Sequence, residues 1–187
     1  MVVRIEKAGF NIREKINEMD GVTLYHKMPP GSVIQVQQGI LTSQTESSAG
    51  NGVRVDLGLG VAITPHFPSS KILVTMDGLS MRTRAVNTFY FLMIQRRFGQ
   101  TGDWVDHWAF AEYAGGGVDS GNNATLYNRE HFPGTSYLDS AGTTQEISYR
   151  LQGQKLSGGG NIAFHHNASG GRGAYNYCTL TAMEVKQ

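Results

Sequence analysis

The side chains best suited to recognise a ligand lie in a loop-rich stretch in the middle of the chain. Aromatic rings alternate there with aspartate, asparagine and histidine, a mixture typical of sugar-binding surfaces, where rings stack on C–H faces and polar groups bind hydroxyls. Trp108 and Phe110 are two residues apart and are expected to fill the core, whereas Trp104 follows Asp103 and is expected to be exposed. The candidate glycan contacts are Trp104, His107, Tyr127 and His131.

Hydrolytic chemistry has weaker support. Cleavage of a glycosidic bond needs two carboxylates beside a cleft, and no spacing among the acidic residues in or near this stretch requires such a pair. These residues are Asp103, Asp106, Glu112, Asp119 and Glu130. No nucleophile-elbow glycine pattern frames any serine. We therefore predict no catalytic residues and no enzyme activity, with a polysaccharide-degrading enzyme as the less favoured alternative.

The histidines and the single cysteine do not form a metal motif. His165 and His166 are adjacent, so in a strand they would point to opposite faces. The sequence has no His-Glu-x-x-His motif and no paired cysteines. One histidine from each subunit around a threefold axis is the alternative that stays open. Cys178 is expected to be a small buried side chain. We predict no metal and no cofactor.

Composition argues against several classes of partner. The 187 residues include 16 basic and 15 acidic ones, scattered along the chain, with a net charge of +1. A nucleic-acid or anionic-membrane surface would need a basic patch. The longest apolar run, residues 89–94, is far shorter than the ~20 residues of a membrane helix. The first residues lack the apolar stretch of a secretory signal. We predict folding in a cytoplasm, no nucleic-acid binding and no membrane insertion.

From Ser32 onward the pattern predicts strands separated by glycine-rich turns. The expected strands are residues 33–38, 53–57, 61–64, 71–76, 88–94, 108–113, 146–152, 161–165 and 178–185. Residues 88–94 are apolar on both faces, which indicates a central strand. About nine to ten short strands at this spacing are typical of a sandwich or jelly roll.

Two of these strands predict which face lies in the core. Ile147, Tyr149 and Leu151 should be buried, with Glu146, Ser148 and Arg150 on the opposite face. The last strand is half apolar on both faces, so either loops of the same chain or a neighbouring subunit should cover its second face.

The first 30 residues form a separate arm in this interpretation. Asn11 and Glu14 are spaced as a helix cap, and Ile12, Ile16 and Met19 fall on one helical stripe. Asp20-Gly21 should end the helix. A helix this short is marginal alone and must dock on something. The predicted organisation is an arm over residues 1–30 and a β-domain over residues 31–187.

Several short segments together resemble a known family. They are residues 69–74, residues 137–140 leading into 143–144 and 147–152, residues 161–164, and residues 179–185. In this order they resemble the trimeric jelly-roll domain of bacteriophage virion structural proteins and tail-fibre tips, over about residues 29–185. The resemblance implies an all-β jelly-roll sandwich with a tumour-necrosis-factor-like plan, assembled as a homotrimer.

The resemblance also implies a function and a location. We expect a non-enzymatic virion structural protein: a short tail or head fibre, a spike or a capsid-decorating component, which folds in the host cytoplasm. The arm would bind other capsid or tail proteins through Phe10, Ile12, Ile16 and Met19. The alternative is a carbohydrate-binding host-attachment module that contacts a host surface glycan.

Overall fold

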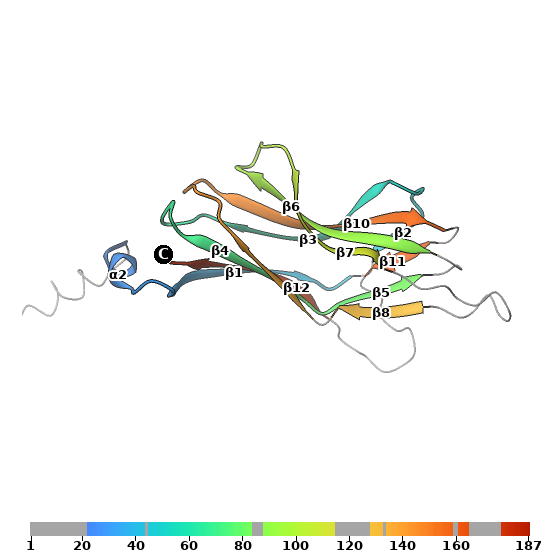
Figure 1. Ribbon diagram of the computed structural model, residues 1–187, viewed down its shortest axis with the longest axis horizontal. Helices are drawn as coiled ribbons and strands as arrows, with labels where there is room; N and C mark the ends of the chain where they lie inside the picture. Colours follow the sequence, from blue (N-terminus) through green and yellow to red (C-terminus); the bar gives the residue numbers. More distant parts are fainter. Residues whose placement is uncertain are drawn as a thin grey trace, which may run out of the picture.

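The fold is built almost wholly from strands. The computed structural model describes residues 22–43, 45–83, 88–114, 128–132, 134–158, 161–164 and 177–187. Those residues form the elements α2 (Val22–Lys27), β1 (Val33–Leu41), β2 (Thr45–Ser47), β3 (Arg54–Ile63), β4 (Lys71–Asp77), β5 (Leu79–Thr83), β6 (Phe89–Phe98), β7 (Val105–Ala114), β8 (Asn128–Phe132), β9 (Thr135–Asp139), β10 (Ile147–Ser157), β11 (Ile162–Phe164) and β12 (Cys178–Val185). The prediction of an all-β domain is confirmed (Figure 1).

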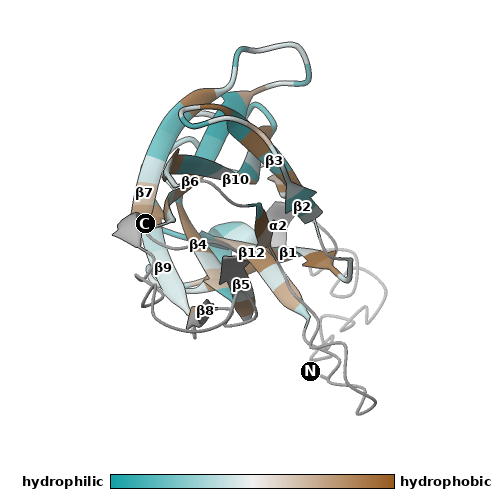
Figure 2. Cartoon of the chain, turned by 90° about the vertical axis from the view of Figure 1, so that its right-hand side faces the viewer, coloured by the Kyte–Doolittle hydropathy of each residue, from teal (hydrophilic) through white to brown (hydrophobic). Residues whose placement is uncertain are grey.

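Two four-stranded antiparallel sheets face each other as a sandwich, one with the strand order β1-β12-β4-β9 and the other with β3-β10-β6-β7. Neighbouring strands are distant in the chain, since β1 pairs with β12 and β3 pairs with β10. Seen along the strands, the two sheets form separate layers (Figure 2). These two orders are those of a jelly roll, a double sheet made from two Greek keys. The predicted jelly-roll sandwich is confirmed.

A third set of strands extends the first sheet at one end of the molecule. Its order, β2-β11-β5-β8, repeats that of the first sheet because β2 follows β1, β5 follows β4, β8 precedes β9 and β11 precedes β12. Gly78, with φ of 79°, lies between β4 and β5, and a Cβ there would be 2.4 Å from the Tyr177 carbonyl oxygen. Glycine therefore lets the chain pass from one sheet into the other.

Alternate side chains of the strands fill the space between the sheets. The buried set comes from both layers and includes Ile72, Val74, Met76, Leu180 and Ala182 from the first sheet and Leu57, Leu59, Leu92, Ile94, Ile147, Tyr149 and Leu151 from the second. The alternation predicted for β10 is confirmed, because Ile147, Tyr149 and Leu151 lie in the core while Arg150 faces outward.

The prediction of a central strand at residues 88–94 is also confirmed. β6 lies between β10 and β7, and Leu92, Met93 and Ile94 are buried in succession. In a strand, successive side chains point to opposite faces. Burial of all three therefore means that β6 is covered on its outer face as well as in the core.

β3 differs from the sequence prediction. Residues 53–57 and 61–64 were expected as two strands, but they belong to one. In the ladder between β3 and β10, Asp56 is paired with Gln152 and Gly60 is paired with Arg150, and the register shifts between these two pairs. Gly58, at φ 77°, carries the chain through this irregularity. The glycines thus mark a bulge inside a strand, not the end of one.

Helix α2 was not predicted, and the helix expected near residues 11–19 lies outside the described residues. The Nζ of Lys186 donates hydrogen bonds to the carbonyl oxygens of Tyr25, His26 and Met28 at 3.1, 2.6 and 2.6 Å. A cation at the carboxyl end of a helix satisfies free carbonyl groups and compensates the helix dipole. Lys186, which directly follows β12, thus holds α2 although the two are more than a hundred residues apart in the chain.

The buried carboxylate of Glu184 also stabilises the contact between α2 and the β-domain. Glu184 is 0% exposed and accepts hydrogen bonds from the backbone NH groups of His66 (2.8 Å) and Phe67 (3.2 Å) and from Nε2 of Gln35 (2.8 Å). Burial alone would raise the pKa of Glu184, but the hydrogen bonds from His66 and Gln35 outweigh it and lower that pKa. The His66 ring packs on Tyr25 with centroids 4.4 Å apart, so the end of α2 rests on the β-domain.

Candidate functional site

The outer face of the β3-β10-β6-β7 sheet gathers polar side chains from strands that are distant in sequence. The register places Ala62, Ser148 and Arg97 side by side across β3, β10 and β6. One step further along, Arg150 of β10 lies next to Gln95 of β6. These residues face away from the core because their neighbours Tyr149 and Leu151 point into it.

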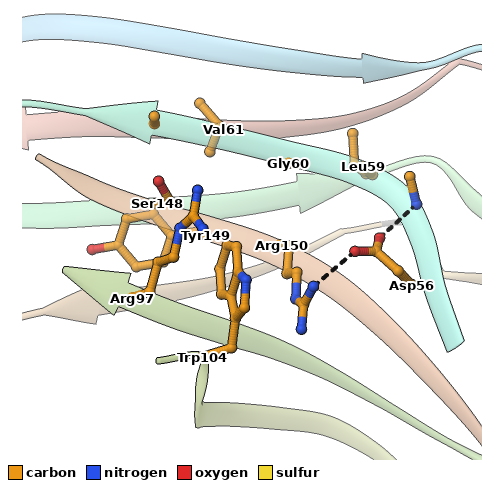
Figure 3. Close-up of a pocket in the computed structure, with 11 residues that line it drawn as sticks. Asp56, Leu59, Gly60, Val61, Arg97, Trp104, Ser148, Tyr149 and Arg150 are labelled. Atoms are coloured by element: carbon orange, nitrogen blue, oxygen red, sulfur yellow. Dashed lines mark hydrogen bonds and ion pairs between the residues drawn. The ribbon is translucent and has the colours of Figure 1, made fainter. Parts of the chain in front are cut away.

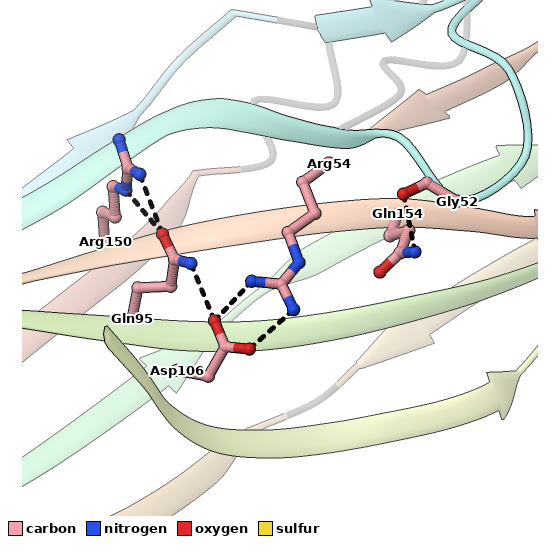
Figure 4. Close-up of polar contacts among 6 residues, drawn as sticks. All are labelled: Gly52, Arg54, Gln95, Asp106, Arg150 and Gln154. Atoms are coloured by element: carbon pink, nitrogen blue, oxygen red, sulfur yellow. Dashed lines mark hydrogen bonds and ion pairs between the residues drawn. The ribbon is translucent and has the colours of Figure 1, made fainter. Parts of the chain in front are cut away.

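A chain of hydrogen bonds joins this face across four strands (Figure 4). Arg54 binds both carboxylate oxygens of Asp106, with Nη2 2.6 Å from Oδ2. The amide of Gln95 donates to Asp106 at 2.8 Å, and the Gln95 oxygen accepts from Arg150 at 2.8 and 3.0 Å. The hydrogen bonds from Arg54 and Gln95 lower the pKa of Asp106. Asp106 is thus held as an anion in an ion pair, which does not suit a general acid.

Trp104 lies between two arginines at the edge of this network (Figure 3). The guanidinium carbon of Arg97 is 4.7 Å from the indole ring centre, and that of Arg150 is 4.2 Å away. Both contacts are within the range of cation–π attraction. Because the two guanidinium groups lie on either side of the indole, its edge and not its faces is available to a ligand.

Beside this stack the surface is hollowed, and we call this depression, with a volume of about 420 Å³, the hollow. Residues 58–62 of β3 form one wall, and Arg97, Trp104, Ser148 and Arg150 contribute to the rest. Asp56 closes one end, where its Oδ2 accepts a hydrogen bond from Arg150 at 3.0 Å. The hollow therefore has a cationic side, an anionic end and two glycines in its wall.

His107 lies in a different place from Trp104. It points between the two sheets, with Nε2 3.4 Å from Oδ1 of Asp139, and packs edge-on against Tyr137. Asp139 is 2% exposed and accepts hydrogen bonds from Arg96 (2.6 Å) and the hydroxyl of Tyr149 (2.7 Å). This cluster connects β9 of one sheet to β6, β7 and β10 of the other.

The electrostatics of the Asp139 cluster are those of a structural ion pair. Burial raises the pKa of Asp139, but its contacts with His107, Arg96 and Tyr149 prevail and lower it to about 2. Burial, together with the hydrogen bond to Asp139, raises the pKa of Tyr149. Both groups thus keep their usual charge at neutral pH, and neither is prepared for proton transfer.

The predicted glycan contacts therefore do not form one site in the part of the chain that is described. Trp104 borders the hollow and His107 lies in the interior. Tyr127 is outside the described residues, and the His131 side chain is not among those described, although its backbone belongs to β8. Arg97, Ser148 and Arg150 were not predicted as site residues, because only the pairing of β6 with β10 brings them together.

The attachment residues Phe10, Ile12, Ile16 and Met19 also lie outside the described residues, so their predicted role stays a prediction.

Within the described ranges, no group of three or more His, Cys, Asp and Glu side chains is placed to hold a metal ion. Cys178 is buried, as predicted, and burial raises the pKa of its thiol to about 12, which leaves it un-ionised at neutral pH. No helix in the same ranges is long and apolar enough to cross a membrane.

The outer face of the other sheet is different. The register aligns Val36 of β1, Met183 of β12, Leu73 of β4 and Leu138 of β9 across all four strands. We call these four residues the apolar row. Val36 is 54% exposed and Leu138 is 45% exposed. Ile40, further along β1, is exposed on the same face.

Comparison with known proteins gives weak structural matches only. No protein-family model matches the chain, and no curated protein matches it. Among solved structures, the chain is similar to the infectious bursal disease virus VP2 subviral particle, with a TM-score of 0.42 and 19% identity over 83% of this chain and 38% of that one. A second match, to the Gx strain of the same virus, has a TM-score of 0.40 and 18% identity, with coverage of 83% and 38%. The chain thus spans less than two-fifths of the length of these matches.

Proposed function

We propose that this chain is a non-enzymatic structural protein of a virus particle, and that it assembles with copies of itself through the outer face of the β1-β12-β4-β9 sheet. Following the sequence resemblance, we further propose that the particle is a bacteriophage and that the assembly is a trimer. Its role there is that of a short fibre, a spike or a capsid decoration.

The apolar row is the observation that carries this proposal. Apolar side chains cross the whole sheet here, with Val36 and Leu138 exposed and Leu73 and Met183 partly exposed in the single chain, which favours burial against another protein surface. The flanking positions fit such contact, because Thr75 and Thr181 are short uncharged side chains on the same face. On β4, Lys71 and Asp77 bracket the row at opposite ends of the strand, so charges lie at the rim and not at the centre.

A second copy of the chain is the occupant we infer for this face. A virus particle is built from many copies of few chains, so a surface of this kind meets its own copies at high local concentration. The sandwich also places α2 next to the end of the C-terminal strand, at one end of the molecule (Figure 1). An arm that leaves from that end can reach a neighbouring protein while the sheets remain packed.

The arm can be tested apart from the fold. Because residues 25–28 pack on the β-domain, the informative truncation removes residues 1–20 and keeps α2. We expect the truncated protein to fold and to associate with itself, yet to be absent from purified particles when it replaces the full chain. Normal incorporation would move the attachment surface into the β-domain and contradict the role of the arm.

The location of the protein is the test of the structural role itself. Labelling of purified particles with an antibody against the folded β-domain, viewed by electron microscopy, should mark regular positions on the capsid or tail. Absence of the protein from purified particles, together with its presence in the lysate, would contradict a virion function.

A further inference from the structure

We propose that the hollow beside Trp104 binds a carboxylate-bearing sugar, with Arg97 as the partner of the carboxylate. This site is independent of the apolar row, since the two lie on opposite outer faces of the sandwich.

The hollow follows from the way in which β3 pairs with β10. Leu57 and Leu59 both point into the core, and the register shift between Asp56 and Gly60 leaves residues 57–59 without partners on β10. Gly58 and Gly60 have no side chains to fill the space that this creates. The resulting volume of about 420 Å³ lies within the range of small-molecule sites, roughly 300–1,000 Å³.

The two arginines of the hollow differ in their partners. Arg150 is bound to Asp56 at 3.0 Å and to Gln95 at 2.8 Å, so its charge is already compensated. The Arg97 side chain makes no hydrogen bond within the described part of the chain, and its Nε is buried without a partner. A buried cationic donor without an acceptor destabilises the empty protein. Arg97 as a whole is only partly buried and lines the hollow, so a carboxylate there would give its guanidinium an acceptor, in the planar geometry that this group prefers.

The rest of the hollow favours a sugar over a simple anion. Asp56 lies at the other end, 48% exposed, and both its oxygens already accept hydrogen bonds, from the Gly58 NH at 2.9 Å and from Arg150. A carboxylate oxygen can accept more than one hydrogen bond, so Asp56 can also receive a hydroxyl group. An inorganic anion that filled the hollow would be repelled by Asp56. A ligand with a carboxylate at one end and hydroxyl groups at the other fits both ends.

Recognition here would rest on hydrogen bonds and charge. Arg97 and Arg150 cover the two faces of Trp104, so a sugar ring would contact the indole edge. The hydroxyl of Ser148, which lies beside Arg97 on the neighbouring strand, can donate to or accept from the ligand. Uronic acids and sialic acids both have this chemistry.

Titration calorimetry on the full-length chain tests the site with D-glucuronic acid, N-acetylneuraminic acid and, as the neutral control, D-glucose. We expect at least one of the two acids to bind about tenfold or more tightly than glucose, and more weakly as salt is raised. Binding by only one acid would identify the sugar class. Equal binding of acids and glucose, or no binding of any of them, would overturn the proposal.

Variants show whether Arg97 is responsible. Arg97→Met keeps the stacked aliphatic stem but removes the charge, and should weaken acid binding about tenfold or more. The matched control is Arg54→Met, on the same outer face but outside the hollow, which should bind as the wild type does. Melting curves establish that both variants are folded, and Arg97→Gln, which also removes the charge, serves in place of Arg97→Met if the latter is not. Unchanged binding in the folded Arg97 variant would overturn the assignment.

Competition with sulfate separates a sugar site from a general anion site. Sulfate should displace the bound acid only at concentrations far above those of the acid itself. Displacement by sulfate at equal concentration would contradict recognition of the hydroxyl groups. None of these results depends on whether the chain associates with itself, so the sugar site and the proposed structural role fail or succeed separately.

Discussion

The two outer faces of this sandwich each belong to a sheet of four antiparallel strands, yet the two sheets use their outward positions in opposite ways. On the β1-β12-β4-β9 sheet, the apolar row leaves Val36 and Leu138 about half exposed. On the β3-β10-β6-β7 sheet, outward side chains bind one another, and Gln95 and Ser148 are buried although they face away from the core. An apolar face without a cover is suited to another protein, whereas a polar face with a hollow, where the Arg97 side chain has no hydrogen-bond partner, is suited to a small polar ligand.

The largest effect should come from charge in the apolar row. Val36→Glu combined with Leu138→Glu should abolish association at micromolar concentration, because a buried interface does not tolerate unpaired carboxylates. Both side chains are exposed in the single chain, so the melting temperature of the monomeric fold should change little. Val105→Glu is the matched control, since Val105 is 61% exposed but lies on the opposite sheet. Loss of association in the control variant would remove the distinction between the faces.

The second-largest effect should come from substitutions on the two faces of β10. Leu151 is fully buried on the core side of β10, so Leu151→Ala should lower the free energy of unfolding by about 2–5 kcal/mol. Ser148→Ala, three residues earlier on the outer side, should cost about 0.5 kcal/mol or less. Urea unfolding of the two variants measures both values. Equal losses would show that the outer face of β10 carries as much of the stability as its core face.

The two sheets are also linked by charge. Asp139 has a pKa of about 2 in the folded protein, below its ordinary value of 3.8. When the pKa of a carboxyl group is lower in the folded protein than in the unfolded chain, its ionised form stabilises the fold. This stabilisation is fully present when the pH is above the unfolded pKa, and it is lost as the pH falls through the folded pKa. Between about pH 4 and pH 2 this group should therefore account for about 2 kcal/mol of lost stability.

Asp139→Asn tests this link. The variant should be less stable than the wild type at pH 7, and the difference should shrink as the pH approaches 2, because protonation then removes the same charge from the wild type. Chemical unfolding at several pH values provides the measurement. A difference that stays constant down to pH 2 would contradict the role of the ionised Asp139.

The smallest effect is expected on the polar face. Arg54 and Asp106 are paired but each is more than 40% exposed, at 43% and 44%. Exposed ion pairs contribute about 0–1 kcal/mol, so Arg54→Gln should change the free energy of unfolding by less than about 1 kcal/mol, and by still less at high salt. A larger loss would mean that the network of Figure 4 stabilises the sheet as a unit.

The sequence predicted the features that depend on the period of a single strand. It did not predict which side chains are brought together by the pairing of distant strands. The sequence of β10 alternates with a period of two, so its core face could be assigned without a partner strand, whereas β12 is half apolar on both faces and gave no such assignment. Trp104 and His107 are three residues apart and were assigned to one surface. They lie on different sides: Trp104 packs against Arg97 and Arg150 of the outer face, whereas His107, an odd number of residues further along, points between the sheets.

The hollow could not be predicted for a related reason. Arg97 and Arg150 are brought to Trp104 by the pairing of β6 with β10, which no local pattern reveals. Helix α2 was missed because its carbonyl groups are satisfied by Lys186, at the far end of the chain. In each case the decisive partner is distant in sequence.

The mass of the isolated wild-type protein in solution tests the central claim most directly, because the apolar face should not stay exposed to water. Light scattering at micromolar concentration should give the mass of three 20.4 kDa chains, with no free single chain. A mass of one chain, 20.4 kDa, at that concentration would contradict the assembly through the apolar row and with it the contrast between the two faces.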